Sequence, residues 1–396
     1  MRKILFLYHV STIGGGSYCL LSILKSLDRG KFLPMVLLQK EGPLCDEIRK
    51  LNIRIFFLPS IRTVPYNSSL FHFRNIKNLI SLARSISDYK SLLSDIRPDA
   101  IYVNTMMMYP YLSPAKKMGI KTYIHIREHW PEQEHKIQRE IAVNSIIHNA
   151  FHIIAINRYS ASIFRNVSER VTIVYDWIDM DIRFCYLPIE TVMNENCNNL
   201  KIYLYTGGLQ SIKGILEIVR TFHKSIKGEN KRLLILGIPE TNRSAKGIIG
   251  IIKNIFSIFG YKTYSQKVFD IIKEDTRIVC KPSVYDISHI MQQVYAMVSY
   301  FTIPHANLAL AEGIIVGTPT IAALTDESLE YSNEGELALL FKLNNIDDFT
   351  SKWLSFDTKY DTLKRKISED SSKIKEKFDS QRNIQILNNV LTSNFE

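Results

Sequence analysis

The chain has 396 residues, enough for two domains that each bury a full core. Its hydrophobic content of 46% and charged content of 22% are ordinary for a globular protein and exclude a largely disordered chain. The 50 lysines and arginines exceed the 39 aspartates and glutamates by a net charge of +11. This excess favours an anionic ligand or surface, without choosing among nucleotides, nucleic acid and acidic lipid.

The cysteines and the lengths of the apolar runs indicate which cellular compartment and which kind of protein to expect. The five cysteines are an odd number with no CxxC pair or Cys/His cluster, so we expect reduced thiols, a cytoplasmic location and no metal site. The first apolar run is short and no small-residue cleavage site follows it, so it is interpreted as a strand rather than a signal peptide. No run of about 18 apolar residues occurs, so no membrane span is expected.

In the first half of the chain, short β-rich runs alternate with helical patterns. The predicted strands lie at 3–10, 32–38, 53–58, 99–104, 121–126, 152–157 and 171–176. Between the third and fourth strands a helix is indicated by the spacing of Phe73, Ile76, Leu79, Ile80 and Ala83. Continuous apolar strands separated by helices predict a parallel sheet covered on both faces.

The pattern breaks over 185–201, which is rich in Asn and has no sustained period. It then restarts, with predicted strands at 201–208, 232–237, 277–282, 295–301 and 319–324. We therefore predict an α/β protein of two doubly wound, Rossmann-like domains facing a cleft. The predicted boundaries are 1–185 for the N-terminal domain, 186–375 for the C-terminal domain and 376–396 for a helical tail that caps the second domain or returns to the first.

Two glycine-containing loops follow strands, where doubly wound sheets bind ligands. The first holds Gly14, Gly15 and Gly16, whose lack of side chains lets a ligand approach the backbone; a flexible turn is the alternative. Its spacing is not GxGxxG, which disfavours a nicotinamide dinucleotide. The second runs from Gly207 and Gly208 to Lys213, and a bound phosphate would explain a lysine before a helix; a solvated lysine is the alternative.

A third candidate is the segment 299–324, "SYFTIPHANLALAEGIIVGTPTIAAL". Asn307 is predicted as the N-cap of a helix that ends at Gly317, which places an anion-binding helix N-terminus beside His305. Glu312 is the one charged residue in this apolar helix. A carboxylate there needs hydrogen-bond donors, from ligand hydroxyls or, alternatively, from a structural salt bridge.

Polar residues also end the strand 121–126, in the order His125, Arg127, Glu128 and His129. Strand alternation places His125 and Arg127 on one side and Glu128 on the other. A polar strand end that simply meets water is the alternative.

Together these motifs resemble glycosyltransferase family 4, the retaining GT-B enzymes, over nearly the whole chain. The segment "EGIIVGTPTIA" matches the family pattern EAMAxGxPVIA, and "RPDAIYVNT", "IIAINRYSASIF" and "VTIVYDWIDMDIRF" follow the family order. The resemblance implies a hexosyltransferase that needs no metal or other cofactor. Its co-substrates would be a nucleoside-diphosphate sugar and a glycan or lipid-linked acceptor, as in cell-surface polysaccharide assembly.

The resemblance also assigns residues. Glu312 would bind the donor ribose and Lys213 the donor diphosphate, and the remaining donor-binding positions would be Gly15, Gly16, Gly208, His305, Ala306, Asn307 and Leu308. At the end of the strand 121–126 the family places a histidine or acidic residue beside the reacting sugar, so the catalytic candidates are Arg127, Glu128 and His125. The first glutamate of the family motif is replaced by Pro304.

Two other functions remain open: a UDP-sugar epimerase of the same fold, and a sugar-nucleotide-binding protein without catalysis. Nucleic acid is not expected, because the basic residues are dispersed and no recognised binding motif occurs. Basic, partly apolar segments at 71–93 and 244–262 suggest contact with an anionic membrane at its inner face, although ordinary surface helices have the same pattern.

Overall fold

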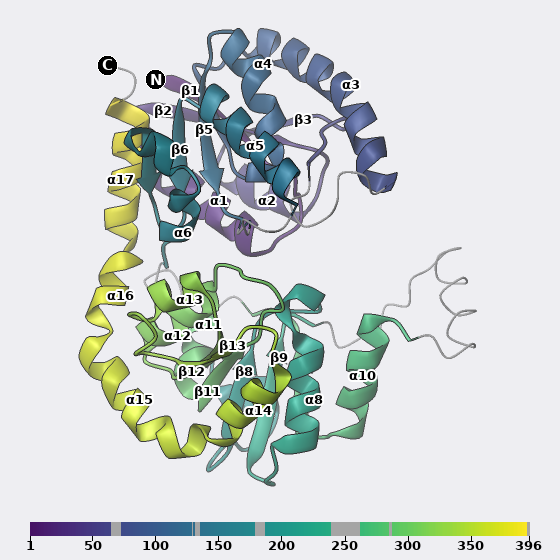
Figure 1. Ribbon diagram of the computed structural model, residues 1–396, viewed down its shortest axis with the longest axis vertical. Helices are drawn as coiled ribbons and strands as arrows, with labels where there is room; N and C mark the ends of the chain where they lie inside the picture. The colour runs from purple at the N-terminus through teal and green to yellow at the C-terminus, as the bar shows by residue number, and fades with distance from the viewer. Residues whose placement is uncertain are drawn as a thin grey trace. The chain divides into compact units, whose positions relative to one another are not determined.

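A computed structural model describes residues 1–64, 73–128, 130, 135–178, 187–238, 262–284 and 287–393, with backbone only for 73–79. The chain divides into two compact units (Figure 1). The first unit is Met1–Trp177 together with Asp379–Glu396, and the second is Ile178–Phe378. The chain therefore leaves the first unit once and returns to it at its C-terminal end.

The first unit is built on a sheet of seven parallel strands in the order β3-β2-β1-β4-β5-β6-β7. The strands are β1 Arg2–Leu7, β2 Phe32–Leu38, β3 Arg54–Phe57, β4 Ala100–Val103, β5 Lys121–Ile126, β6 His152–Ala155 and β7 Val171–Ile173. Its helices are α1 Gly15–Ser26, α2 Pro43–Lys50, α3 Phe73–Ile96, η1 Met106–Tyr111, α4 Leu112–Lys117, α5 Lys136–Asn149, α6 Arg158–Ser162, η2 Arg165–Arg170 and α17 Ser380–Ser393. The strands and the helix predicted for this half of the chain are confirmed.

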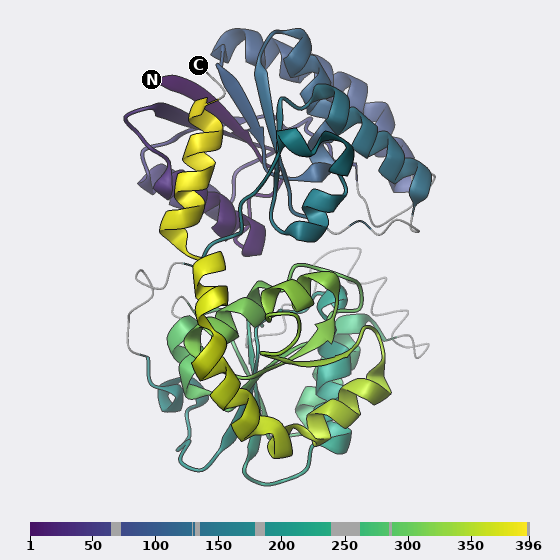
Figure 2. The ribbon, with the colours of Figure 1, turned by 60° about the vertical axis from the view of Figure 1, so that its left-hand side comes forward.

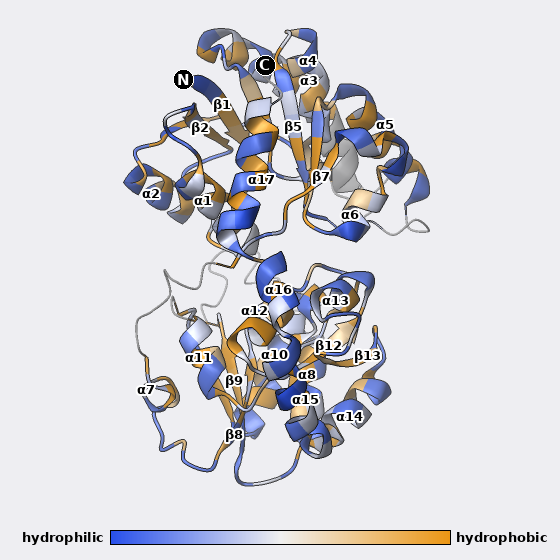
Figure 3. Ribbon diagram, turned by 90° about the vertical axis from the view of Figure 1, so that its left-hand side faces the viewer, coloured by the Kyte–Doolittle hydropathy of each residue, from blue (hydrophilic) through white to orange (hydrophobic). Residues whose placement is uncertain are grey.

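Alternating side chains of β1 show why both faces of this sheet are covered. Ile4 and Phe6 belong to a core closed by α1, α2 and α17, whereas Leu5 and Leu7 belong to a second core closed by α3, α4 and α5. A strand buried on both faces must be apolar throughout, which is the pattern that the sequence showed. Figure 3 shows these strands as hydrophobic ribbons between helices with polar outer surfaces.

The second unit repeats this architecture with six parallel strands in the order β10-β9-β8-β11-β12-β13. The strands are β8 Lys201–Tyr205, β9 Lys231–Leu236, β10 Ile278–Lys281, β11 Ala296–Ser299, β12 Thr320–Leu324 and β13 Leu339–Lys342. Its helices are α7 Ile189–Met193, η4 Ser211–Lys213, α8 Ile215–Ser225, α10 Tyr264–Glu274, α11 Ile287–Gln293, α12 Leu308–Val316, α13 Asp326–Tyr331, α14 Ile346–Leu354, α15 Phe356–Asp370 and α16 Ser372–Lys377. The prediction of two doubly wound sheets is confirmed, and β13 is a strand that the sequence did not indicate.

The C-terminal segment joins the first unit through α17. Leu387, Val390 and Leu391 are buried in the core that α1 and α2 also close. Asn383 accepts a hydrogen bond through Oδ1 from the backbone N–H of Tyr175, at 3.0 Å. Figure 2 shows the helix along the first sheet, with both chain ends at the same end of the unit.

Within the described residues, no helix combines the length and the apolarity that crossing a membrane requires.

Candidate active site

Strand order locates the ligand-binding edge of each sheet. In the first sheet the winding reverses between β1 and β4, and in the second between β8 and β11. Ligands of open α/β sheets bind outside the carboxyl ends of the strands at such a reversal. The candidate loops are therefore those that follow β1, β4, β8 and β11, and the predicted glycine loops are two of these four.

The loop after β8 is held tightly by Tyr205. Its hydroxyl lies within hydrogen-bonding distance of the carbonyl oxygens of Gly208, at 3.1 Å, and Lys213, at 3.3 Å. A Cβ atom on Gly207 would overlap the Tyr205 ring, and Gly208 has a φ of +65°, a backbone conformation that favours glycine. Both glycines are therefore required by the loop itself, with or without a ligand.

Lys213 ends the short turn η4, and Gly214 at a φ of +62° then redirects the chain into α8. The Lys213 side chain is half-buried, and burial lowers its pKa below the usual value. Among the described residues, its ammonium group has no hydrogen bond or ion pair. A partly buried cation without a counter-ion is unfavourable, and a bound anion would supply the missing negative charge.

The N-terminus of α8, next to Lys213, is partly occupied by the protein. The Leu216 N–H donates a hydrogen bond to the Tyr264 hydroxyl at the start of α10, at 3.2 Å. One first-turn donor of α8 is therefore already paired within the protein.

The N-terminus of α12 is built as predicted. Asn307 is its N-cap, and its Oδ1 accepts hydrogen bonds from the Leu310 N–H at 3.3 Å and from the Ser299 hydroxyl at 3.1 Å. Asn307 is 2% exposed, and its Nδ2 has no hydrogen-bond partner among the described residues. Leu308 is the first helical residue, so its N–H has no partner within the helix. Gly317, with a φ of +86°, ends the helix, as the sequence predicted.

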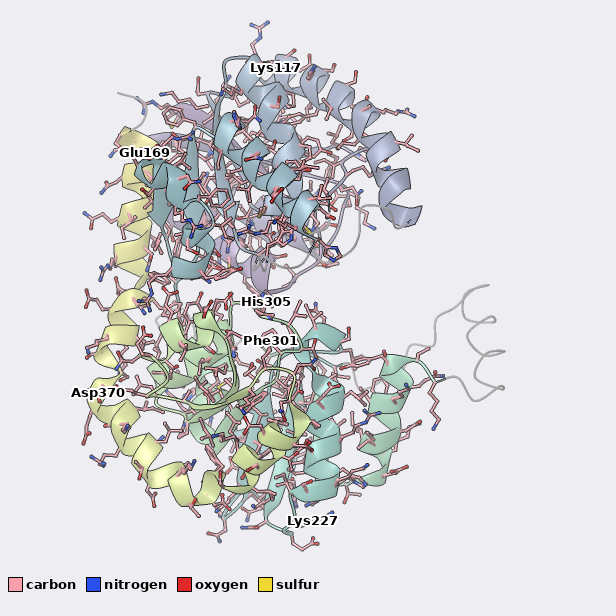
Figure 4. All side chains as sticks on the ribbon, in the orientation of Figure 1. Lys117, Glu169, Lys227, Phe301, His305 and Asp370 are labelled. Carbon is pink, nitrogen blue, oxygen red and sulfur yellow. The ribbon has the colours of Figure 1, made fainter. Side chains whose placement is uncertain are left out.

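Glu312 lies on α12 and is half-buried. It takes part in an interaction with the protein, so its position alone does not require a ligand. His305 and Ala306 lie on the loop between β11 and α12, and the His305 ring packs edge-on against Phe301 with centroids 5.2 Å apart (Figure 4). The donor roles of these residues stay predictions.

In the first unit, α1 begins at Gly15 after the loop that follows β1. A Cβ atom on Gly16 would lie 2.6 Å from the hydroxyl oxygen of Tyr8, whereas one on Gly15 would meet nothing within 4 Å. The Ser17 hydroxyl donates to the carbonyl oxygen of Thr12 at 2.7 Å, which fixes the loop. Gly16 therefore has a packing reason to be glycine, whereas Gly15 has none among the residues that the structure describes.

Arg127 is the centre of a buried polar network at the end of β5. Its Nε donates to Asn104 Oδ1 at 3.0 Å, its Nη2 donates to His125 Nδ1 at 3.2 Å, and its Nη1 donates to Asp176 Oδ1 in an ion pair. Burial disfavours the charged guanidinium, yet the carboxylate of Asp176 keeps the pKa of Arg127 above its usual value. The prediction that His125 and Arg127 share a side is confirmed by this contact.

The contacts of His125 define its protonation. Arginine only donates, so Nδ1 accepts from Arg127, and the Tyr102 hydroxyl must also donate to Nδ1, at 2.7 Å. Burial, and then the positive charge of Arg127, hold the pKa of His125 well below its usual value. The imidazole is therefore neutral, with its proton on Nε2.

Glu128 is fully engaged in local structure. Its Oε2 accepts hydrogen bonds from the backbone N–H groups of Met106, at 2.9 Å, and Arg127, at 3.1 Å, and its Oε1 accepts from the Thr105 hydroxyl. The carboxylate thus caps η1, the turn that follows β4. Burial raises the pKa of Glu128. Its catalytic role stays a prediction, and His129 lies outside the described residues.

Sequence reasoning missed three members of the Arg127 network: Asn104, Tyr102 and Asp176. Each stands at or near a strand end, and Asp176 lies in the quoted segment "VTIVYDWIDMDIRF". For Asp176 the available signal was an acidic residue at the end of the predicted apolar strand 171–176. Among the described residues, no three His, Cys, Asp or Glu side chains gather into a metal-binding cluster.

Comparison with known proteins bears on the fold. No protein-family model matches the chain, and neither does any curated protein. Solved structures do match, among them Anabaena HepE in complex with UDP-glucose, with a TM-score of 0.75 at 17% identity over 99% of this chain and 100% of that one. Sucrose-phosphate synthase from Thermosynechococcus elongatus has a TM-score of 0.70 at 12% identity, over 100% and 99% of the two chains. A glycosyltransferase from Rickettsia africae ESF-5 has a TM-score of 0.67 at 16% identity, over 99% of each.

The chain has the GT-B fold.

In this GT-B chain the predicted site residues fall into two groups, one in each unit. Gly208, Lys213, His305, Ala306, Asn307, Leu308 and Glu312 lie on or after the loops that follow β8 and β11, which are neighbouring strands. Gly15, Gly16, His125, Arg127 and Glu128 lie at the carboxyl edge of the first sheet. The second-unit group and the two glycines of the first unit lie at the reversal points of their sheets, whereas His125, Arg127 and Glu128 lie one strand further along, at the end of β5.

Proposed function

We propose that this protein is a retaining glycosyltransferase of the family 4 type that transfers a hexose from a nucleoside-diphosphate sugar. The observation that carries the proposal is the half-buried ammonium of Lys213, which lacks a counter-ion among the described residues and stands at the reversal point of the second sheet. A diphosphate supplies the missing negative charge. HepE has been crystallised with UDP-glucose, with UDP and glucose, and with UDP, which supports a uridine nucleotide as the first donor to test.

The leaving nucleoside diphosphate gains negative charge as the glycosidic bond breaks. Lys213 opposes that charge directly, and the open N–H groups at the start of α12 add oriented dipoles. Groups fixed before the reaction need no rearrangement during it, so they stabilise the transition state more than water does. We infer that no metal is required, and we expect activity to survive chelation of divalent cations.

The first unit would hold the acceptor and the reacting sugar. Arg127 and His125 are the groups proposed to contact sugar oxygens, because both are buried polar side chains at the carboxyl end of β5, and Arg127 contacts Asn104 in the loop after β4 at the reversal point. Glu128 is proposed to shape this site by capping η1, since its two oxygens already accept three hydrogen bonds. The epimerase and non-catalytic alternatives are not favoured by the structural neighbours.

The acceptor is proposed to be a glycan or a lipid-linked glycan of the cell surface, reached from the cytoplasmic face of a membrane. Nearly all of the net charge of +11 lies in the first unit, whereas basic and acidic side chains almost balance in the second. On α5 of the basic unit, Ile137 and Ile141 are 73% and 49% exposed, one helical turn apart. Most of the segment 244–262 and the start of 71–93 lie outside the described residues.

Sedimentation with vesicles tests this membrane contact. Charge attraction predicts binding to vesicles that contain acidic lipid, with loss of binding in neutral vesicles and at high salt. Replacing Ile137 and Ile141 by Ser should weaken binding to acidic vesicles. Equal sedimentation with neutral and acidic vesicles would argue against the proposal.

The decisive test of the donor site compares Lys213→Met with Lys224→Met, a matched change at an exposed lysine of α8. Thermal unfolding is followed with and without a panel of nucleoside diphosphates and their sugars. At about 100 times its Kd, a ligand should raise the Tm of wild type by about 5 to 10 °C. K224M should keep this shift. K213M should lose it while gaining stability without ligand, because an unpaired buried charge has been removed.

The same lysine predicts a pH dependence. Because burial lowers the pKa of Lys213, the group loses its proton at a lower pH than an exposed lysine does. Nucleotide affinity should therefore fall on the alkaline side at a lower pH than it would with a lysine of ordinary pKa, as calorimetric titration would show. A wild-type protein with no response to any nucleotide would refute the proposed function.

A further inference from the structure

Arg127 is held on three sides by residues from three other positions in the first unit. Of the five N–H donors of its guanidinium, one each is used by Asn104, His125 and Asp176, which leaves two without a partner among the described residues. The side chains of Arg127 and Asp176 are 9% and 19% exposed, so the ion pair is largely removed from water. Burying both charges has a large desolvation cost, and removing one partner leaves the other charge buried and uncompensated.

Asn104, which lies beside Arg127, has a further hydrogen-bond donor without a partner among the described residues. Asn104 is fully buried, and its Oδ1 accepts from Arg127 Nε, which orients its amide nitrogen. That nitrogen, Nδ2, has no hydrogen-bond partner among the described residues. A buried donor without an acceptor is unfavourable unless a ligand supplies one. Arg127 and Asn104 therefore both offer N–H donors that have no acceptor among the described residues.

Asp176 is itself fixed by the tertiary structure. It follows β7, and the N–H of the preceding residue, Tyr175, donates to Asn383 Oδ1 on α17. The carboxylate is thus attached to a backbone segment that is tied to the C-terminal helix, whereas Arg127 is at the end of β5, two strands away. Asp176 can set the direction of the guanidinium without moving itself.

We propose that Asp176 is a positioning residue of the transfer reaction: by clamping Arg127 it aims the two remaining guanidinium N–H groups, together with Asn104 Nδ2, at oxygen atoms of the sugar. This inference rests on the proposed function. The ion pair neutralises Arg127, so the ligand group recognised here is an uncharged hydroxyl rather than a phosphate. The same clamp keeps Arg127 Nη2 on His125 Nδ1 and thereby keeps the imidazole proton on Nε2.

The test uses the full-length protein with Asp176→Asn and Asp176→Glu. The control is Glu169→Gln, which breaks an ion pair with Arg170 that is largely exposed on the acidic side, at 69%. The reaction followed is donor hydrolysis without acceptor, in which water attacks the anomeric carbon of UDP-glucose, the bond to the diphosphate oxygen breaks, and glucose, UDP and a proton are released. UDP affinity is measured in parallel by calorimetry.

D176N should lower kcat by about 100-fold, the usual loss when an aligned group is displaced by about 1 Å, with UDP affinity unchanged. D176E, which keeps the charge but moves it by one methylene group, should be intermediate, and E169Q should match wild type. The pH profile should also change: once Arg127 turns away, its positive charge no longer adds to the effect of burial on the pKa of His125, so the acid limb of the profile should move to higher pH in D176N.

The two proposals can fail separately. If D176N hydrolyses donor like wild type with the same pH profile, the clamp is refuted and the glycosyltransferase proposal stands. If wild type neither binds UDP nor turns over donor, the function is refuted, and nitrogen NMR of His125 then decides the clamp: Nδ1 should be unprotonated in wild type and altered in D176N. If D176N does not fold, donor hydrolysis, UDP affinity and the pH profile are measured on D176E instead.

Discussion

Gly15 and Gly16 are adjacent, yet they differ in what a methyl group would meet. At Gly16 it would press on the Tyr8 hydroxyl at 2.6 Å, and Tyr8 is only 7% exposed, so its ring has little room to move. At Gly15 it would enter open space. Glycine at position 16 is explained by packing. Packing among the described residues gives glycine at position 15 no such cause, and close approach of a donor is its predicted role.

Alanine at each position separates these causes. Gly16→Ala should lower the free energy of unfolding by about 1 to 3 kcal/mol through overpacking. Gly15→Ala should leave stability unchanged or raise it by about 0.4 to 1 kcal/mol, because alanine restricts the unfolded chain. If a donor approaches Gly15, G15A should nevertheless weaken nucleotide binding. Chemical denaturation and calorimetry give the two quantities, and equal destabilisation by both changes would contradict this account.

At the scale of elements, α12 is fixed by close packing. A Cβ atom on Gly313 would lie 2.6 Å from Thr320 Oγ1 and 3.0 Å from Met297 Sδ, so glycine lets the helix approach β11 and β12. The N-cap Asn307 and the terminal Gly317 then set where the helix begins and ends. This explains how an apolar helix can present a defined N-terminus at the edge of the sheet.

Asp275 connects α10, β10 and α8 at the amino edge of the second sheet, the edge opposite the candidate site. It follows α10 and accepts hydrogen bonds from the Arg277 side chain before β10 and, at 3.3 Å, from His223 Nδ1 on α8. The Arg277 side chain donates onward to the carbonyl oxygen of Ile226 at 2.8 Å. Hydrogen bonding from Arg277 lowers the pKa of Asp275 to about 2.

The lowered pKa of Asp275 predicts a pH-dependent stability. A carboxyl group whose pKa is depressed on folding stabilises the native state above its unfolded pKa, near 3.8, and loses this contribution as the pH falls towards about 2. Asp275→Asn should therefore cost about 2 kcal/mol at pH 7, and the cost should shrink below about pH 4. Urea denaturation across this range measures it. Asp270→Asn, at an exposed ion pair with Lys262, should change stability by less than about 1 kcal/mol.

At the scale of the whole molecule, the first unit is completed only by the end of the chain. Leu391 is fully buried in its core, and Arg2 Nη1 donates to the carbonyl oxygen of Thr392 at 3.4 Å. The first and last elements thus lie together, and the second unit is inserted between them in sequence. The first unit cannot be complete until α17 has been synthesised.

Leu391→Ala should therefore destabilise the first unit, although position 391 follows the whole second unit in sequence. Truncation of a buried leucine costs about 2 to 5 kcal/mol. Hydrogen exchange should show faster opening across β1 and β2 and unchanged protection in β8 and β9. Gln385→Ala, at an exposed position of the same helix, is the matched control. Loss of protection in β8 and β9 instead would contradict the assignment of α17 to the first unit.

The sequence located the elements because its signals are local. Strands buried on both faces must be apolar throughout, and caps such as Asn307 and Gly317 act within a few residues, so both could be predicted from neighbours in the chain. The missed strand, β13, is a short edge strand with weak patterning. The predicted glycine loops lie at the carboxyl edges of their sheets because all loops that follow parallel strands share that edge.

Only the tertiary structure decided what each side chain does at those edges. Arg127 forms an ion pair with Asp176 and a hydrogen bond with Asn104, and Glu128 caps η1. Helix α17 completes the core of the first unit. These contacts join residues that are far apart in the chain, and their geometry depends on the order and spacing of strands. A single sequence gives the identity of each polar residue but not its partner, and the partner determines whether a buried charge supports the fold or awaits a ligand.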